Sequence, residues 1–441
     1  MKNLFLTNRF FGLFGLLVVA FATSFFVPVL LQLAQILLAL VVALTVLDFT
    51  LLFGKRDLVE AHRKQAKIFS LSDPNPVKLT VINQSRQRLF LKIIDEIPVQ
   101  FQQRNFMLDA SIAPGEAEEI KYELRPLQRG VYIFNRINLF ATTLLGLAER
   151  RISIPAEVQV SVYPSILQMK QFEYRAFDRL SNHQGIKRLR RIGHSYEFEQ
   201  IKNYVRGDDH RSINWKASSR RADLMVNQYQ DERAQQVYCI IDKSRAMRMP
   251  FDGLSLMDYA VNTSLAVSNI ALKKYDRAGL ITFSDKMGAT LKADNKATQL
   301  SKILLTLYNE TDRPMEANYE LLYQASRKLI TGGRSLILLF TNFESSYALD
   351  RVLPILRRIN NNHLLVVIFF ENTEIRDFVN GEVKTLEGIY RHTIAQKFLA
   401  EKSAMVHKLK QFGIQAILTE PQALSMNTIN KYLELKARGL I

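Results

Sequence analysis

The first stretch of the chain has almost no polar positions. Between residues 10 and 54 the one ionisable side chain is that of Asp48. The stretch is long enough for two membrane-crossing helices of about 20 residues each, and Pro28 near its middle favours a break between them. The pattern therefore predicts a membrane anchor over 1–54, with transmembrane helices at about 10–27 and 30–53.

Basic residues flank this anchor on both sides. Lys2 and Arg9 precede the first apolar run, a cluster that begins at Lys55 follows the second, and the loop between them has no charge. The positive-inside rule therefore predicts a multi-pass protein of the inner membrane whose soluble domains face the cytoplasm. A cleaved signal peptide is the alternative, but no small-residue cleavage site precedes polar sequence. We expect Asp48 to reach water or Lys55 at the inner interface.

The pattern changes to short alternating runs after the anchor. Turn-forming segments such as DPNP and APGE separate these runs. Short strands at this spacing predict an all-β, antiparallel, immunoglobulin-like sandwich over 55–165. No catalytic constellation lies there, so we expect a spacer or docking surface. The runs are VKLTVIN (77–83), RLFLKII (88–94), EEIKYEL (118–124), GVYIFNRINLF (130–140) and VQVSVYP (158–164).

Near-continuous apolar runs alternate with helical patterns in the last part of the chain. Residues 347–359 show helical spacing of leucine, valine and isoleucine. Buried strands separated by helices predict an α/β domain over 236–441 with a mostly parallel sheet covered on both faces. In such sheets the ligand site lies beyond the carboxyl ends of the strands. The predicted strands are 237–242, 278–284, 335–341, 364–370 and 414–419.

The chain is strongly basic, with 59 Lys and Arg against 42 Asp and Glu, a formal net charge of +17. An anionic neighbour is therefore expected. Charge is dense in the connector over 166–235, where IKRLRRIG (186–193) can contact anionic lipid or an acidic protein. A solvated loop and non-specific nucleic-acid binding are the alternatives; the membrane tether favours lipid or protein, and we expect no specific nucleic acid. The predicted contact residues are Lys187, Arg188, Arg190 and Arg191.

The sequence lacks the residues or motifs that several classes of functional site require. A single cysteine, Cys239, excludes an intramolecular disulfide and a multi-thiolate metal centre. The sequence also has no phosphate-binding loop of the G-x-x-x-x-G-K-[ST] type and no G-x-S-x-G nucleophile elbow. We therefore expect a protein that is not an enzyme.

Residues 196–233 hold the most distinctive string of the chain, YEFEQIKNYVRGDDHRSINWKASSRRADLMVNQYQDER. The string resembles the signature of the DUF58 family, in which an E-F pair and a later G-D-D-x-R-x-I-x-W-K segment precede a strand that ends in an aspartate. RGVY (129–132), LLGL (144–147) and VYPS (162–165) agree with the same family, so the resemblance covers nearly the whole chain. The matching residues are Glu197, Phe198, Tyr204, Gly207, Asp208, Asp209, Arg211, Ile213, Trp215 and Lys216.

The charged residues of this signature allow two interpretations. Asp208 and Asp209 with Arg211 and Lys216 can form an ion network that holds the connector against the following domain. The alternative is a carboxylate-based hydrolase that uses Asp208, Asp209 and Glu197. Adjacent residues on an extended segment point to opposite faces, so they do not converge on one bond. We therefore favour the structural network.

Asp242 and Ser244 stand at the carboxyl end of the first predicted strand of the α/β domain, in DKSRAM. This segment resembles the opening of a von Willebrand factor A domain, whose metal-ion-dependent adhesion site begins D-x-S-x-S. The resemblance implies a Mg²⁺ ion with one coordination position left for a partner's acidic side chain. The second serine is Ala246 here, and amides stand near the two later ligand positions. We expect a metal-free recognition surface without a cofactor; the alternative is metal-dependent ligand binding at a degenerate Mg²⁺ site of Asp242, Ser244, Asn318 and Asn342.

These observations combine into one functional hypothesis. The anchor, the sandwich and a von Willebrand A-like (Rossmann-like) α/β domain predict a non-enzymatic docking or scaffold protein at the inner membrane. Its expected partners are membrane lipid and other proteins. The DUF58 resemblance implies in addition that a MoxR-type AAA+ ATPase acts with the chain in assembling or maturing other proteins.

Overall fold

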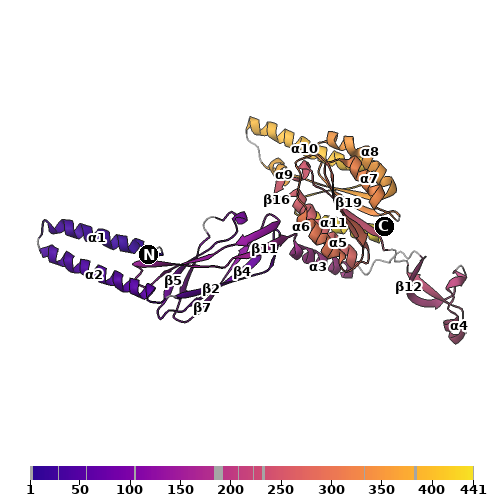
Figure 1. Ribbon diagram of the computed structural model, residues 1–441. Coiled ribbons are helices and arrows are strands. Elements are labelled where there is room, and N and C mark those ends of the chain that lie inside the picture. The colour runs from indigo at the N-terminus through magenta and orange to yellow at the C-terminus, as the bar shows by residue number, and fades with distance from the viewer. Residues whose placement is uncertain are drawn as a thin grey trace. The chain divides into compact units, whose positions relative to one another are not determined.

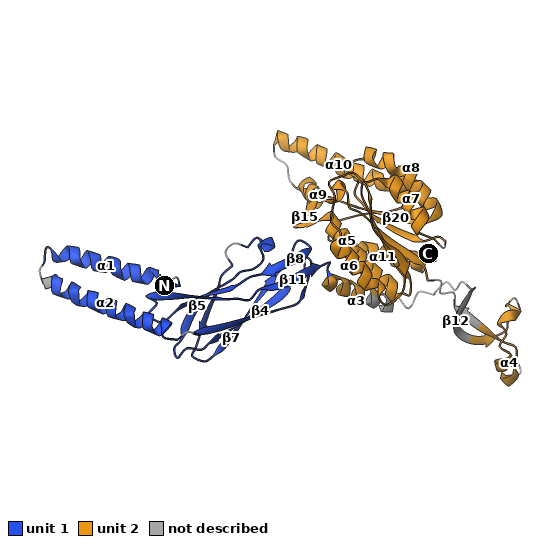
Figure 2. Ribbon diagram, viewed as in Figure 1, with its two compact units in different colours: residues 1–165 blue, residues 166–441 orange. Residues whose placement is uncertain are grey.

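The computed structural model describes residues 3–440 except 28, 56, 104–105, 183–191, 207, 222, 231–233, 332 and 382–384. The chain forms two compact units, residues 1–165 and residues 166–441 (Figure 2). The first unit contains a helical hairpin and a β-sandwich, and the second contains an α/β domain and a β-hairpin (Figure 1). The multidomain architecture that the sequence predicts is confirmed.

Two antiparallel helices form the N-terminal hairpin, α1 (Asn8–Ser24) and α2 (Val29–Phe53) (Figure 1). Many large apolar side chains of both helices are exposed; Leu16 is 67% exposed and Ile36 is 68% exposed. Among the described residues, one helix is long and apolar enough to cross a membrane, the 24-residue segment Leu30–Phe53, and α1 is a shorter apolar helix. An apolar surface of this extent needs a non-aqueous neighbour.

Asp48 joins the end of α2 to the sandwich. Its side chain is fully buried, and its Oδ2 accepts hydrogen bonds from the backbone N–H groups of Leu147 and Ala148, each at 2.8 Å. The hydroxyl of Thr143 donates to Oδ1. The expectation that Asp48 reaches water or Lys55 is therefore wrong, because a loop distant in sequence folds back onto the helix and supplies its donors.

The remaining contacts at this junction also cross between hairpin and sandwich. Strand β1 (Leu4–Leu6) pairs antiparallel with β10 (Ala148–Ile154) just before α1 begins. The guanidinium of Arg150 donates to the carbonyls of Leu52 at 2.6 Å and Lys55 at 2.7 Å, so it satisfies acceptors left free at the end of α2. Hairpin and sandwich are thus joined by a sheet pairing and by buried hydrogen bonds.

The sandwich consists of a five-stranded sheet in the order β1-β10-β9-β5-β6 and two three-stranded sheets in the orders β2-β4-β7 and β3-β11-β8. Every pairing in these sheets is antiparallel except β3 with β11. Strict alternation of buried and exposed positions along β5 shows why the sequence forms a half-buried strand there. The other bounds are β2 (Val59–Gln65), β3 (Ile68–Ser70), β4 (Asn75–Asn83), β5 (Leu89–Asp95), β6 (Leu108–Ile112), β7 (Ala117–Leu124), β8 (Gly130–Phe134), β9 (Ile137–Thr142) and β11 (Val158–Tyr163), with a 3₁₀ turn at η1 (Val99–Phe101).

The single run predicted at 130–140 is two strands. β8 pairs with β11, whereas β9 pairs with β5 and β10 in the other sheet, so the chain changes sheet between them. The sandwich core also contains a buried ion pair between Arg63 and Asp95, and the hydroxyl of Tyr122 donates to the same carboxylate. The residue Arg63, which lies in the basic cluster after the anchor, is therefore a core residue rather than a membrane-surface one.

The α/β domain is a six-stranded sheet in the order β18-β17-β14-β19-β20-β21 (Figure 1). Five strands are parallel and β18 is an antiparallel edge strand. The order reverses between β14 and β19, which defines the switch point where doubly wound sheets bind ligands. The strands are β14 (Gln236–Asp242), β17 (Arg277–Phe283), β18 (Met287–Asp294), β19 (Leu336–Phe340), β20 (Leu364–Phe370) and β21 (Gln415–Thr419).

Helices cover both faces of this sheet, as the near-continuous apolar strands predict. Along β14, Val237, Cys239 and Ile241 pack into one core and Tyr238 and Ile240 into the other. The first core receives α3 (Ile166–Asn182), α5 (Leu256–Lys273), α6 (Gln299–Asn309) and α11 (Leu424–Ala437); the second receives α7 (Tyr319–Leu329), α8 (Ser346–Asn362) and α10 (Leu386–Gln411), with α9 (Thr373–Asn380) before α10.

The predicted connector contains regular structure. Its first part is helix α3, which packs on α5 and whose Glu173 accepts a hydrogen bond from Asn269 at 2.8 Å. Its second part is an antiparallel hairpin of β12 (Ile192–Asn203) and β13 (Met225–Gln230) that carries η2 (His210–Ser212) and α4 (Trp215–Arg221). We call residues 192–230 the arm. The short elements η3 (Arg245–Met247), β15 (Pro250–Phe251) and β16 (Leu254–Ser255) lie between β14 and α5.

Candidate functional site

Asp242 lies at the carboxyl end of β14, beside the switch point of the sheet. It is 1% exposed, and its Oδ1 accepts the backbone N–H of Ser244 at 2.8 Å. Its Oδ2 accepts the hydroxyl of Thr341 at 2.7 Å, and Tyr319 in turn is hydrogen-bonded to that hydroxyl at 2.7 Å. Burial raises the pKa of the Asp242 carboxyl above its ordinary value. Both oxygens of this carboxyl are thus bonded inside the protein.

The two amides predicted as metal ligands also have partners. The Asn318 Oδ1 accepts the N–H groups of Glu320 at 3.1 Å and Leu321 at 3.3 Å, so this side chain caps α7. The Asn342 Oδ1 accepts a hydrogen bond from the ammonium of Lys402 at 3.0 Å. The oxygens of Asp242, Asn318 and Asn342, which the alternative assigned to a metal, therefore make structural hydrogen bonds, and that of Asn342 already contacts a cation.

These residues do not fit a magnesium site. Mg²⁺ requires a near-octahedral shell of oxygens and gives up its water reluctantly. Across the described residues, no group of three or more His, Cys, Asp or Glu side chains is placed to hold a metal. A divalent cation at the Asn342 oxygen would also lie against the positive charge of Lys402, which repels it.

Lys402, at the carboxyl edge of the sheet, is unusual because its ammonium group is buried. It lies on α10, is 3% exposed, and donates to Asn342 and to the carbonyl of Phe343. Its Nζ lies 5.8 Å from the ring centroids of both Phe369 and Phe398. Burial lowers its pKa to about 8, while the charges of Glu344 and Glu401 act in the opposite direction. A lysine so far inside the protein carries a large desolvation cost when it is charged.

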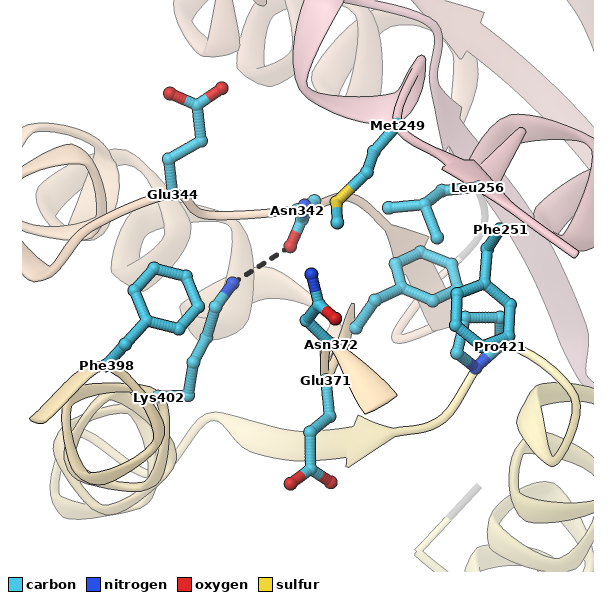
Figure 3. Close-up of a pocket in the computed structure, with 11 residues that line it drawn as sticks. Met249, Phe251, Leu256, Asn342, Glu344, Glu371, Asn372, Phe398, Lys402 and Pro421 are labelled. Carbon is cyan, nitrogen blue, oxygen red and sulfur yellow. Dashed lines mark hydrogen bonds between the residues drawn. The ribbon is translucent and has the colours of Figure 1, made fainter. Parts of the chain in front are cut away.

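A cavity of about 180 Å³ opens beside Lys402 (Figure 3). Its lining is mostly apolar, and Asn342 and Asn372 add polar groups. Figure 3 shows the ammonium of Lys402 turned toward Asn342 and the carboxylates of Glu344 and Glu371 turned away from it. The apolar lining residues are Met249, Phe251, Leu256, Phe370, Phe398 and Pro421.

The signature residues of the arm have separate structural roles. The Asp208 carboxylate accepts hydrogen bonds from the ammonium of Lys202 and from the N–H of Val205, each at 2.9 Å. Asp209 caps η2 by accepting the N–H of Arg211 at 3.0 Å. The recorded ion pair of Asp208 is therefore with Lys202, a residue that the predicted network did not include. Both aspartates are held by local contacts, which supports a structural role over a hydrolytic pair.

Other signature side chains face solvent. Trp215 on α4 is 69% exposed, and Lys216 beside it is exposed as well. Tyr204 stacks on His210 with ring centroids 5.7 Å apart. The backbone of Glu197 and Phe198 lies in β12. The side chains of Glu197 and Phe198, together with Gly207 and the predicted contact residues Lys187, Arg188, Arg190 and Arg191, lie outside the described residues.

Residues 200–375 match the sequence model of the family described as "Protein of unknown function DUF58". The resemblance that the signature carries is confirmed over this segment. The "Uncharacterized protein YeaD" of Bacillus subtilis (strain 168) is 26% identical over 126 residues, which are 28% of this chain. The alignment spans 31% of that relative, about a third of its length.

Several solved structures are similar to parts of the chain. BatB from Bacteroides thetaiotaomicron covers 45% of this chain and 99% of its own, with 12% identity and a TM-score of 0.30. The CARDB domain of the PF1109 protein from Pyrococcus furiosus covers 24% of this chain and 91% of its own, with 16% identity and a TM-score of 0.17. The strand order of the α/β domain is that of a doubly wound, Rossmann-like sheet.

Lys402 was not predicted as a site residue, although the sequence contains a signal for it. On α10 it is in helical phase with Phe398, Met405 and Leu409, of which the last two are core residues. A lysine among apolar residues at helical spacing marks a buried charge. Other apolar residues of α10, such as Ile389 and Tyr390, are exposed and lie around the helix, so the stripe does not stand out in the sequence.

Proposed function

We propose that this chain is a non-enzymatic docking protein held at the inner membrane, with its soluble domains in the cytoplasm. The observation that carries the proposal is the apolar hairpin, whose second helix is bonded into the sandwich through Asp48. The hairpin offers lipid an apolar surface, while the sandwich keeps the rest of the chain at the membrane surface. Recognition falls to the α/β domain and the arm.

The length of the hairpin supports insertion in a bilayer. Asp48 is covered by the sandwich, so the lipid-facing part of α2 runs from Leu30 to Leu47, about 27 Å at 1.5 Å per residue. A hydrocarbon core is about 30 Å thick, and local thinning accommodates the difference. Lys2 precedes α1 in the sequence, Arg9 lies in the first turn of α1, and Lys55 follows α2, which supports the cytoplasmic orientation.

Two exposed features support protein recognition. The cavity at the carboxyl edge of the sheet combines an apolar wall with the buried cation of Lys402. The arm presents Trp215, which is 69% exposed, next to basic side chains of α4. Tryptophan and arginine are the residue types most enriched at energetically important positions of protein interfaces. The DUF58 resemblance suggests a MoxR-type AAA+ ATPase as the partner.

Vesicle flotation tests this proposal. The full chain is reconstituted in vesicles with anionic lipid, mixed with the purified MoxR-type ATPase, and floated on a density gradient. We expect the chain to float, to resist alkaline extraction, and to carry the ATPase to the top. The membrane assignment fails if the chain is extracted by alkali; the partner assignment fails if the chain floats and the ATPase stays at the bottom.

Orientation requires a separate measurement on cells. Protease added to spheroplasts should leave the α/β domain intact, and protease added after lysis should cleave it. Cleavage in intact spheroplasts would place the soluble domains on the other side of the membrane and would contradict the cytoplasmic assignment.

A further inference from the structure

The charge of Lys402 has no counter-ion within the described part of the chain. Its recorded acceptors are the amide oxygen of Asn342 and the carbonyl of Phe343, both uncharged. The nearest acidic neighbours have other partners: Glu344 lies 3.6 Å from Arg245, and Glu401 accepts the N–H of Ser346 at 2.6 Å. A buried ammonium that bonds only to neutral oxygens is strongly attracted to any anion that reaches it.

The donor count of Lys402 leaves room for such an anion. A lysine ammonium has three N–H groups, and the structure records two acceptors for this one. Its cavity neighbours Glu344 and Glu371 turn their carboxylates outward (Figure 3), so they leave the space beside the ammonium to other groups. The charge of Glu371 acts instead on Arg376.

The lining of the cavity indicates which kind of chemical group the anion is attached to. Six apolar side chains line a space of about 180 Å³, below the size range of pockets for drug-sized molecules and suited to one large apolar side chain. An aspartate or glutamate side chain brings a carboxylate but no large apolar group that could pack against this wall. A C-terminal residue with an apolar side chain carries both groups on one carbon atom.

We propose that this cavity binds the C-terminal residue of a partner polypeptide, with Lys402 holding the terminal carboxylate and the apolar wall holding the side chain. The proposal rests on the docking function above and specifies the chemistry that docking recognises. Lys402 supplies the positive charge at an edge where Asp242, Asn318 and Asn342, three of the four candidate metal ligands, are otherwise bonded. Recognition then requires no metal.

The test uses two small probes that differ only in the carboxylate. N-acetyl-phenylalanine and N-acetyl-phenylalaninamide are titrated calorimetrically into the full chain in detergent micelles, in the presence of a chelator. We expect the acid to bind about tenfold more tightly than the amide or better, because a charge-assisted bond is lost with the amide. Equal affinities for acid and amide would overturn the proposal.

Variants on one helix separate the role of Lys402 from general charge effects. Lys402→Met should weaken the acid about tenfold or more and leave the amide unchanged, whereas Lys397→Met, at an exposed position of the same helix α10, should change neither. A Lys402→Met chain that still binds the acid as the wild type does would refute the assignment. Cys239, buried in the core of the same domain, verifies the fold, because it stays protected from thiol reagents only in folded protein.

A third probe tests the C-terminal assignment itself. N-acetyl-aspartate α-amide carries a side-chain carboxylate without an apolar group, and we expect it to bind no better than N-acetyl-phenylalaninamide. Binding as tight as that of N-acetyl-phenylalanine would assign the cavity to acidic side chains and overturn the C-terminal assignment. Flotation with the ATPase is independent of these titrations, so a failure here with intact co-flotation refutes the cavity proposal and leaves the docking function.

Discussion

Replacing Lys402 by methionine should change how the stability of the α/β domain depends on pH. The ordinary pKa of a lysine is 10.5, and burial lowers that of Lys402 to about 8. Between these values the unfolded chain binds more protons than the folded chain, so stability rises with pH across this window. Below pH 8 the cost of burying the charge is fully present, and above pH 10.5 it is gone. Methionine fills similar space and has no proton to bind.

The size of the effect follows from the same two pKa values. Each pKa unit corresponds to about 1.4 kcal/mol, so the burial of the charged form costs about 3 kcal/mol at pH 7 and less than about 1 kcal/mol at pH 10. The stability difference between the two proteins should therefore change by about 2–3 kcal/mol over this range. The acidic groups near Lys402, namely Glu344, Glu371 and Glu401, are present in both proteins, so their contributions cancel in the difference.

The single cysteine of the chain provides the assay. Cys239 lies in the middle of β14 and is 1% exposed, so a thiol reagent reaches it only when the α/β domain opens. When the domain recloses faster than it is labelled, the labelling rate reports the free energy of opening. Thiol reactivity in the opened chain depends on pH equally in both proteins. We expect the ratio of wild-type to Lys402→Met labelling rates to fall about 30- to 150-fold from pH 7 to pH 10.

Two results would refute this reasoning. A ratio that stays constant between pH 7 and pH 10 would mean that Lys402 keeps an ordinary pKa and is in contact with solvent. A similar change of the ratio for Lys397→Met, at an exposed position of α10, would mean that any lysine on the helix produces the effect.

Three further predictions concern other parts of the chain. Asp48→Ala leaves the buried N–H groups of Leu147 and Ala148 without an acceptor and should destabilise the first unit by about 3 kcal/mol or more. The loss should appear as faster proteolysis of the loop 143–147 in micelles, and unchanged proteolysis would contradict the buried junction. Calorimetric titration of the full chain with Mg²⁺ should show no saturable binding. Saturable binding that is lost in Asp242→Ala would restore the metal hypothesis. Trp215, the one tryptophan, should be readily quenched by acrylamide in the free chain and protected by a partner that covers the arm; protection in the free chain would contradict its 69% exposure.

The buried parallel strands of the α/β domain follow closely from the sequence. The run at 364–370 is strand β20 residue for residue, and 237–242 is extended by one residue in β14. Such strands are buried on both faces, so their whole length is apolar and their ends are visible. The edge strand β18 was not predicted, because MGATLKAD has one exposed face and little apolar content.

The contacts that define the sites could not be predicted, because they join residues far apart in the chain. Asp48 and Leu147 are 99 positions apart, and Lys402 and Asn342 are 60 positions apart. Strand and helix periodicity report which face of an element is buried and not which polar group will meet it there. The sequence therefore placed Asp242 and Asn342 at the right edge of the sheet and could not place Lys402 beside them.

Site-specific crosslinking in native membranes can show whether the cavity beside Lys402 holds the C-terminus of a partner polypeptide. A photo-crosslinking amino acid is placed at Met249, which lines the cavity, in the otherwise unchanged full chain, and the crosslinked peptide is identified by mass spectrometry. We expect an adduct with the last residues of a partner polypeptide that disappears when Lys402→Met is added. Adducts that map to the interior of the partner, or that persist unchanged in the Lys402→Met chain, would contradict it.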